Sequence, residues 1–479
     1  MPESLSYVAL SYCWGGLKFF NTTKENIHSL KRGFSVSILE QTLQDAIQVA
    51  RDLDMRYIWI DGLCIIQNDT LDWEREVTMM ADVYNNTEVT IAAFSAVNVK
   101  EGFLHPRTPV PFTQHWTDES GSTTSLAARP RVVTGLHALD HNPFGPGNPF
   151  LDPVQRRGWC FQEEILSRRL IIYSTNEIQW LCRSETRCEC SRLDAGNTTS
   201  TPFTSYLSQL RQDPFGFWAE KFPEYTERAF TCWRDRLPAI SGIASTIRSL
   251  TSSNYVAGIW LNDFTRSLSW TASPADIKPC SPMYTAPSFS WTSINSPIYE
   301  FDDRYSSPEH AMLTLRDWKL EPKGIDPLGE VRHASLTVSG FVHHATITYD
   351  EDLWRDTFRV DIANRTAEFH QDTDLEKCAA KSLCGTKNAW SVRRSKNKMP
   401  AKHEWEGGVS VLAICLFRDP AWATAFLILG PSSVDSDKLE RIGIAEFLHS
   451  EHRWGQLDAS DDWMTEIIDP RYLRTTTIV

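Results

Sequence analysis

The sequence predicts an α/β N-terminal domain built on a parallel sheet with flanking helices, then a helical middle region and a mostly β C-terminal region. Three observations support this prediction. Short apolar runs alternate with helical patterns before residue 100, and helical spacing returns over 203–250. From about residue 330 the chain consists of short alternating segments separated by turns. We therefore expect three regions, namely 1–200 with an insertion or lid at 102–156, 201–329 and 330–479.

The elements of the first region follow from its apolar pattern. Residues 6–14, SYVALSYCW, are β-branched and aromatic and end at a pair of glycines, which is typical of a strand. Apolar residues at helical spacing occupy 37–53, and 57–60 reads as a second buried strand. A helix should begin near Thr70 or Asp72, which are good N-caps, and 88–94 should be a third strand. The expected apolar face of that helix is Trp73, Val77, Met80 and Tyr84.

Strand, helix, strand, helix, strand is typical of a parallel sheet with crossover helices. Residues 7–12 and 57–60 are nearly all apolar, so we expect them to be neighbouring central strands covered on both faces. The Pro-, Gly- and His-rich stretch 102–156 shows no long periodic element. Beyond it we expect a helix through 162–166 and a hairpin of two strands, 169–174 and 177–182.

The C-terminal segments predict a series of short strands, interrupted by a polar stretch at 371–408. The segments are ASLTVSGFV, ATITYD, VSVLAICLF, ATAFLILG, RIGIAEFL and RTTTIV.

Composition excludes several classes of function. The net charge of −13 argues against a nucleic-acid partner, because phosphate binding needs a concentrated basic face. No window approaches 18 consecutive apolar residues, so we expect no membrane span. The N-terminus lacks a charged segment followed by an apolar one, so we expect no signal peptide. Eleven cysteines then read as reduced thiols of a cytoplasmic protein. The sequence does not define an oligomeric state.

Polar side chains follow the strand at 57–60. Asp61, Cys64 and Gln67 lie just beyond its end, and ligands of open α/β sheets usually bind past the carboxyl ends of strands. Asp61 would be a carboxylate in such a crevice, with Gln67 as a polar partner. The structural alternative makes Asp61 a backbone anchor and Cys64 a small buried hydrophobe.

Other chemistries have weaker support. A thiol nucleophile at Cys64 or Cys13 needs a base, and His28 is the only histidine before residue 105. Glu76 follows the crevice on the next helix and could form a carboxylate pair with Asp61, or only favour the helix dipole. A zinc site lacks the usual paired spacing and a nearby histidine, so we expect no metal. Its candidate ligands are Cys182, Cys188 and Cys190.

Four stretches together resemble the fungal heterokaryon-incompatibility (HET) domain. They are YVALSYCWGG, YIWIDGLCIIQND, EVTMMADVYNNTEVTIAA and RRGWCFQEEILSRRLIIYS, over roughly residues 6–175. The downstream segments RDRLPAISGIAS, YVAGIW and APSFSW resemble the usual continuation of such proteins. The chain departs from the family pattern at Ile66, usually Asn, and at Glu76, usually Gln. The pattern carries onto Trp14, Gly15, Asp61, Cys64, Gln67, Met80, Tyr84, Arg157, Trp159, Gln162 and Glu163.

The resemblance implies fungal origin and a role in non-self recognition and regulated cell death. It also implies a TIR-like, Rossmann-like sheet, and many TIR domains cleave NAD, which would here be a substrate rather than a cofactor. Neither an NTPase motif nor a repeat is present as a sensor. The candidate catalytic residues are Asp61, Glu76 and Glu163, and the candidate substrate-binding residues are Trp14, Cys64, Gln67, Trp73, Arg157 and Trp159.

An alternative function is a cofactor-free enzyme of secondary metabolism, for instance a cyclase or pericyclase. Trp14, Trp59, Trp73 and Trp159 occur in the same blocks and could wall an apolar pocket with a few polar groups. The structural alternative places these tryptophans in the core. Both functions predict a small-molecule ligand in the strand-end crevice, and we expect one cleft to be formed by Asp61, Gln67, Arg157, Trp159 and Glu163. The structural alternative is an internal Arg–Asp pair that closes the domain.

Overall fold

The computed structural model divides into two compact units, and each is described by itself. Unit 1 is 1–213 with 228–230 and 239–243, and unit 2 is 214–227, 231–238 and 244–479. The three-region division stays a prediction. The residues that the structure describes are 5–106, 112–117, 120–128, 152–175, 177–182, 185–189, 203–273, 277–278, 284–301, 303–350, 357–372, 409–419, 423–432, 435, 437–448 and 466–479.

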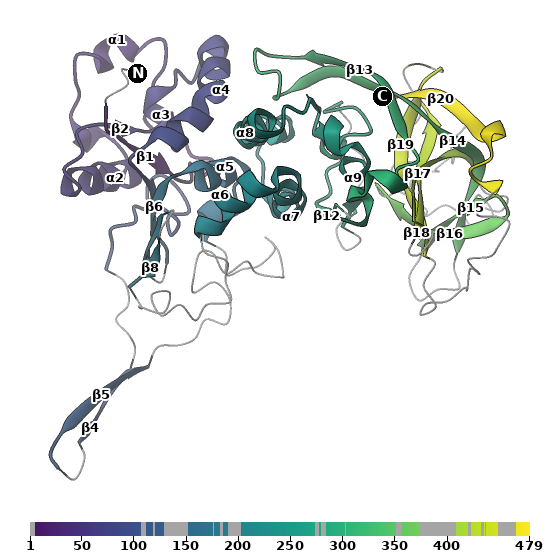
Figure 1. Ribbon diagram of the computed structural model, residues 1–479. Helices are drawn as coiled ribbons and strands as arrows, with labels where there is room; N and C mark the ends of the chain where they lie inside the picture. Colours follow the sequence, from purple (N-terminus) through teal and green to yellow (C-terminus); the bar gives the residue numbers. More distant parts are fainter. Residues whose placement is uncertain are drawn as a thin grey trace, which may run out of the picture. The chain divides into compact units, whose positions relative to one another are not determined.

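A mixed sheet forms the centre of unit 1, with strand order β2-β1-β3-β6-β7-β8 (Figure 1). The first four strands of this order are parallel to one another. Strand β7 pairs antiparallel with β6, and β8 pairs antiparallel with β7. The predicted parallel sheet and the predicted hairpin, now β6 and β7, are both confirmed. The strands are β1 Val8–Ser11, β2 Ile58–Trp59, β3 Val89–Ala92, β6 Arg169–Tyr173, β7 Ile178–Cys182 and β8 Thr186–Cys188.

One expectation about this sheet is wrong. Strand β2 pairs with β1 as predicted, but within the described residues it is the edge strand and is only two residues long. Its apolar character comes from contacts made by its side chains rather than from a second neighbouring strand. Trp59, only 4% exposed, lies against Tyr84 with ring centroids 5.7 Å apart, so it belongs to the core and not to a pocket wall.

Helices cover both faces of the sheet. Helix α2, Gln41–Asp52, packs Leu43 and Ala46 into one core cluster with Val8 and Leu10 of β1. On the opposite face the Tyr7 hydroxyl donates to the Val83 carbonyl of α4, Thr70–Asn86. The cap of α4 is Asp69, whose side chain accepts from two backbone amides, rather than Thr70 or Asp72 as predicted. Helix α5, Gly158–Leu166, packs against α4.

The remaining elements of unit 1 are short. Part of the predicted insertion is an antiparallel hairpin of β4 and β5, and the rest of 107–151 lies outside the described residues. The elements are α1 Ile27–Leu30, η1 Val36–Ile38, α3 Asp61–Cys64, β4 Phe112–Thr117, β5 Thr123–Ala128, η2 Pro153–Arg156 and α6 Phe203–Gln212.

Unit 2 begins with helices and short strands, as the sequence predicts for the middle of the chain. Helix α8 starts in unit 1 and continues into unit 2. The elements are α7 Pro214–Glu227, η3 Trp233–Arg236, η4 Pro238–Ile240, α8 Ser241–Thr251, β9 Tyr255–Val256, β10 Ile259–Trp260, η5 Leu261–Asp263, α9 Phe264–Ser267, β11 Thr271–Ala272, η7 Trp291–Ser293, β12 Ile298–Glu300, η8 Asp303–Ser306 and η9 Pro308–His310.

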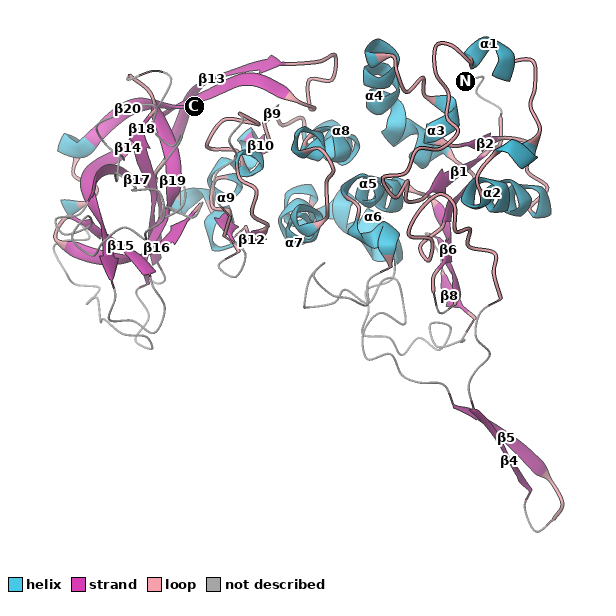
Figure 2. Ribbon diagram, turned by 180° about the vertical axis from the view of Figure 1, so that it is seen from behind, coloured by secondary structure: helices cyan, strands magenta, loops and turns pink. Residues whose placement is uncertain are grey.

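The C-terminal part of unit 2 is mostly β, as predicted, and its strand pairings form a closed path, β14-β15-β16-β19-β18-β17 and back to β14 (Figure 2). Two predicted strands, ASLTVSGFV and ATITYD, are one long strand, β14, while β15 and β16 were not predicted. The polar stretch 373–408 lies outside the described residues. The elements are β13 Thr314–Pro322, β14 Val331–Asp350, β15 Thr357–Ile362, β16 Arg365–Gln371, β17 Val409–Asp419, β18 Ala423–Pro431, β19 Leu439–Leu448, η11 Pro470–Tyr472 and β20 Leu473–Ile478.

A buried arginine anchors the closed sheet to the segment before it. Arg441 of β19 pairs with Asp372 through two hydrogen bonds, of 2.8 and 3.1 Å. It also donates to the carbonyls of Leu268 and Trp270, and its guanidinium lies 3.6 Å from the Trp270 ring centroid. Four hydrogen bonds and a stacked ring satisfy this cation, so we assign it a structural role.

Candidate functional site

The candidate site lies at the carboxyl ends of β1 and β2. The chain leaves β1 to form β2 on one side and later returns to form β3 on the other, so the crossovers diverge at this end of β1. In open α/β sheets, ligands usually bind at such a reversal, past the carboxyl ends of the strands. Tyr12 to Trp14 follow β1 and Asp61 to Cys64 follow β2, which places both segments at this edge.

Asp61 is the partly buried carboxylate of this edge. The indole N–H of Trp14 donates to Oδ2 at 3.0 Å, and the Gly62 amide donates to Oδ1 at 2.6 Å. Burial raises the pKa of Asp61, while the charge of Arg157 opposes that shift. Asp61 is therefore more than a local backbone anchor, because a side chain from another strand end holds it.

Glycine at position 62 lets the turn after β2 approach the residues that follow β1 closely. A Cβ atom there would lie 2.9 Å from the Phe19 ring and from the Tyr12 hydroxyl. Phe19 in turn packs edge-on against Trp14, with ring centroids 4.9 Å apart. The turn after β2 and the loop after β1 thus fix the Trp14 indole against the Asp61 carboxylate.

Arg157 enters the site from the start of α5. Its Nη1 donates to the Tyr12 carbonyl, which ties α5 to the end of β1. The Gly158 amide donates a hydrogen bond to the Ala229 carbonyl at 3.1 Å, which fixes the start of α5. Burial lowers the pKa of Arg157, but its acidic neighbours Cys160, Cys13, Glu163 and Asp61 together raise it more. Arg157 is thus a fixed cation in this part of the site.

Glu163 lies deeper, nearly two helical turns after Arg157 along α5. It is 6% exposed, and its Oε2 atom has no hydrogen-bond partner within the described ranges. Burial raises its pKa to about 7, with a Ser11 hydrogen bond opposing and the charge of Asp61 adding to the shift. Asp61 acts on the pKa of both Arg157 and Glu163, so these three side chains lie near one another. That they line one cleft together with Gln67 and Trp159 stays a prediction.

Two tryptophans lie at the start of α4 and α5. Trp73 and Trp159 are partly exposed and pack edge to face, with ring centroids 6.3 Å apart. Glu76 lies one turn after Trp73 on α4, and burial raises its pKa, with the charge of Asp72 adding. The indoles can contact a planar ring, and Glu76 supplies a second acid near the crevice.

Cys64 and Gln67 lie beside Asp61 but in different roles. Cys64 is exposed as a residue, yet nearby protein atoms desolvate its thiol and raise the pKa to about 11, with Asp61 and Glu76 adding. The Gln67 amide donates to the backbone carbonyls of Asp61 and Ile65, both at 3.0 Å. Gln67 thus fixes the turn that presents Asp61, and its function in ligand binding stays a prediction.

Neither the Cys13 thiol nor the Cys64 thiol is activated as a nucleophile. Burial raises the pKa of Cys13, like that of Cys64, to about 11, so both are protonated at neutral pH. Within the described ranges no three metal-binding side chains gather at one place. Cys190 and the side chain of Cys188 lie outside those ranges, so the zinc hypothesis stays untested.

Sequence reasoning missed the buried layer below Asp61. Tyr12 and Ser11 belong to the first apolar block, and Cys160 follows Trp159, so none stands out by type or spacing. The Tyr12 hydroxyl is buried and, in the part of the chain described, has no hydrogen-bond partner of normal geometry. The one available signal was position, because Tyr12 follows the end of a central strand.

Comparison with known proteins identifies the class of unit 1. Residues 7–163, about a third of the chain, match the family model of the heterokaryon incompatibility protein (HET). This match confirms the resemblance of the sequence blocks to the HET family, and the matched segment contains every candidate site residue. No curated protein and no solved structure matches the chain. None of the helices described combines the length and hydrophobicity needed to cross a membrane.

Proposed function

We propose that this chain acts in fungal non-self recognition and regulated cell death, and that its HET domain hydrolyses the N-glycosidic bond of a dinucleotide such as NAD. The observation that carries the proposal is Asp61, a desolvated but partly exposed carboxylate held at the strand-end crevice by Trp14 and Gly62. The strand order β2-β1-β3-β6 is that of doubly wound sheets and supports the TIR-like arrangement.

The proposed chemistry assigns one task to each group. The bond between ribose C1′ and the nicotinamide nitrogen breaks, and its electron pair goes to the ring, which leaves as neutral nicotinamide. The Asp61 carboxylate stabilises the positive charge that develops on the ribosyl group. Water adds to C1′, and its proton passes to Asp61 or Glu76. No cofactor is needed for this step.

The other side chains supply recognition. Arg157 has donors suited to a phosphate oxygen, and the residue as a whole is partly exposed. The Trp73 and Trp159 indoles would bind the cationic nicotinamide ring through cation–π attraction, which is lost once the ring becomes neutral. That loss favours release of the product.

The test is nicotinamide release from NAD by the purified full chain, measured by chromatography. Asp61→Asn should lower the rate by about a hundredfold or more, because it removes the stabilising charge. Asp82→Asn, which neutralises an exposed acid on α4, is the matched control and should keep the wild-type rate. Absence of nicotinamide release by wild-type protein, or equal rates for Asp61→Asn and wild type, would contradict the proposal.

A cofactor-free cyclase is the second candidate, and the observation in its favour is the partial exposure of Trp14, Trp73 and Trp159 beside a few polar groups. Such an enzyme would hold a flexible substrate in a reactive shape. A gene position inside a terpene or polyketide cluster, together with no NAD turnover, would favour it. An isolated polymorphic locus would favour incompatibility.

A further inference from the structure

The buried layer under Asp61 contains more polar groups than it can satisfy. Glu163 and Tyr12 are 6% and 3% exposed. Among the described residues the Glu163 Oε2 atom has no hydrogen-bond partner, and the Tyr12 hydroxyl interacts with Asp61 without normal hydrogen-bond geometry. A buried carboxylate with one unpartnered oxygen is costly, whereas a buried carboxylic acid is far less so. The geometry therefore favours a proton on Glu163.

Few of the groups around Glu163 carry charge at neutral pH. Burial is the first cause in each case, raising the pKa of Tyr12, Tyr84 and Cys160 well above their ordinary values and that of Cys13 to about 11. All four are therefore neutral near pH 7. The titratable groups facing Glu163 are Tyr12 and Cys13 after β1, Asp61 in α3, Tyr84 in α4, and Arg157 and Cys160 in α5.

Asp61 and Arg157 are the two opposite charges that act on Glu163. Glu163 is neutral or anionic depending on its proton. With Glu163 protonated these three groups are balanced, and with Glu163 ionised they carry one excess negative charge. An anionic ligand meets less repulsion in the balanced state.

We propose that Glu163 is a positioning residue that holds a proton beneath Asp61, balances Asp61 against Arg157, and so couples the binding of an anionic nucleotide to proton uptake. The coupling to a nucleotide rests on the proposed function, whereas the proton on Glu163 does not. The proton comes from the buffer and joins the Glu163 carboxylate, and no covalent bond to the ligand forms. Binding should weaken by up to about tenfold per pH unit above about pH 7.

Infrared difference spectroscopy tests the proton itself, without any ligand. Spectra of the full chain at about pH 5 and about pH 9 should show a carboxylic-acid band that titrates near pH 7 and is absent in Glu163→Gln. Asp61→Asn should move this titration down by about one pH unit, because the neighbouring negative charge is gone. Asp82→Asn should leave it in place. Identical spectra for wild type and Glu163→Gln would overturn the proposal.

Calorimetric titration with ADP-ribose, in two buffers of different ionisation enthalpy, tests the coupling. Wild-type protein should take up as much as one proton on binding, and Glu163→Gln should take up none and bind with little dependence on pH. Glu163→Asp, which keeps the carboxyl, should restore part of the uptake. Binding of ADP-ribose without proton uptake would overturn the coupling. No binding of ADP-ribose would count against the proposed function, and the infrared titration would then decide the role of Glu163 alone.

Discussion

Glu163→Gln should stabilise unit 1 above neutral pH and leave its stability almost unchanged in mild acid. Burial raises the pKa of Glu163 from an ordinary value of 4.5 to about 7. The folded state therefore binds the proton more tightly than the unfolded state does. Glutamine resembles the protonated form in shape and charge, so the variant lacks only the cost of ionising this carboxyl.

The sign and size follow from linkage between proton binding and folding. Below about pH 4.5 the group is protonated in both states, and its favourable contribution is fully present. As pH rises toward about 7 the unfolded state loses its proton first, so the wild-type free energy of unfolding falls. Each pKa unit is worth about 1.4 kcal/mol, so the shift amounts to about 3 kcal/mol. Above about pH 8 the difference between variant and wild type should be constant.

The assay is urea-induced unfolding of both proteins over a pH series, with fluorescence as the signal and limited proteolysis to show which unit unfolds. Asp82→Asn corrects for the loss of one exposed acid from unit 1. Combining Glu163→Gln with Asp61→Asn should give a smaller gain, because the Asp61 charge raises the pKa of Glu163. A stability difference that is the same at acid and alkaline pH would refute the reasoning.

Three further substitutions test other parts of the structure, again by urea unfolding. Trp14→Phe keeps an aromatic ring but removes the indole N–H that reaches the site carboxylate, which should cost unit 1 about 1–2 kcal/mol and raise the pKa of that carboxylate. Gly158→Ala should lower the free energy of unfolding by about 1–3 kcal/mol, because the added Cβ would overlap the Phe230 ring. Adding Phe230→Leu to this variant should restore part of the loss. Unchanged stability of Gly158→Ala would contradict this prediction. Asp372→Asn should destabilise unit 2 by about 3–5 kcal/mol and leave unit 1 unchanged, because it leaves the charge of buried Arg441 uncompensated. Equal unfolding of the variant and wild type would argue against the Arg441–Asp372 pair.

Periodicity predicts most of the elements of this fold because it reports which face of a segment is buried. It predicts β1, β3, α2 and α4 in unit 1, and in unit 2 it predicts β17, β18, β19 and β20 but not β15 or β16. It does not report which strands become neighbours. Strand β2 is apolar but lies at an edge, since its burial depends on Trp59 meeting Tyr84 of a helix. Likewise β14 reads as two strands, because its two halves pair with different partners.

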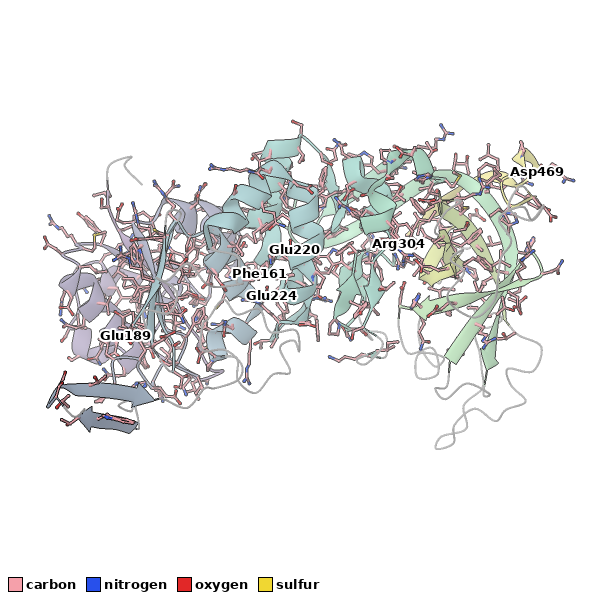
Figure 3. The ribbon with its side chains drawn as sticks, turned by 60° about the horizontal axis from the view of Figure 1, so that its bottom comes forward. Phe161, Glu189, Glu220, Glu224, Arg304 and Asp469 are labelled. Atoms are coloured by element: carbon pink, nitrogen blue, oxygen red, sulfur yellow. The ribbon has the colours of Figure 1, made fainter. Side chains whose placement is uncertain are left out.

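The surroundings of the Phe161 side chain, labelled in Figure 3, could not be predicted from the sequence, although Phe161 lies within a recognised sequence block. The Arg228 guanidinium lies 4.7 Å from its ring centroid and 3.4 Å from Glu164, so a segment far downstream completes the environment of α5. The block between Arg157 and Glu163 fixes the residue types, but the partners that set their burial come from elsewhere in the chain. Burial, in turn, decides which carboxyl keeps a proton.

The two acids of the site illustrate how position in the fold separates groups of the same chemical type. Asp61 lies at the crevice, accepts two hydrogen bonds and remains partly exposed, so its charge is supported. Glu163 lies deeper, and although Ser11 bonds to it, its Oε2 atom has no partner among the described residues, so its charge is less well supported. The sequence names both as candidate catalytic acids and cannot rank them, because only depth below the strand ends distinguishes them. Opposite environments for neighbouring acids are how one site provides an anion and a proton at the same pH. The arrangement therefore predicts that loss of Asp61 removes the reacting charge, whereas loss of Glu163 changes how the site responds to pH.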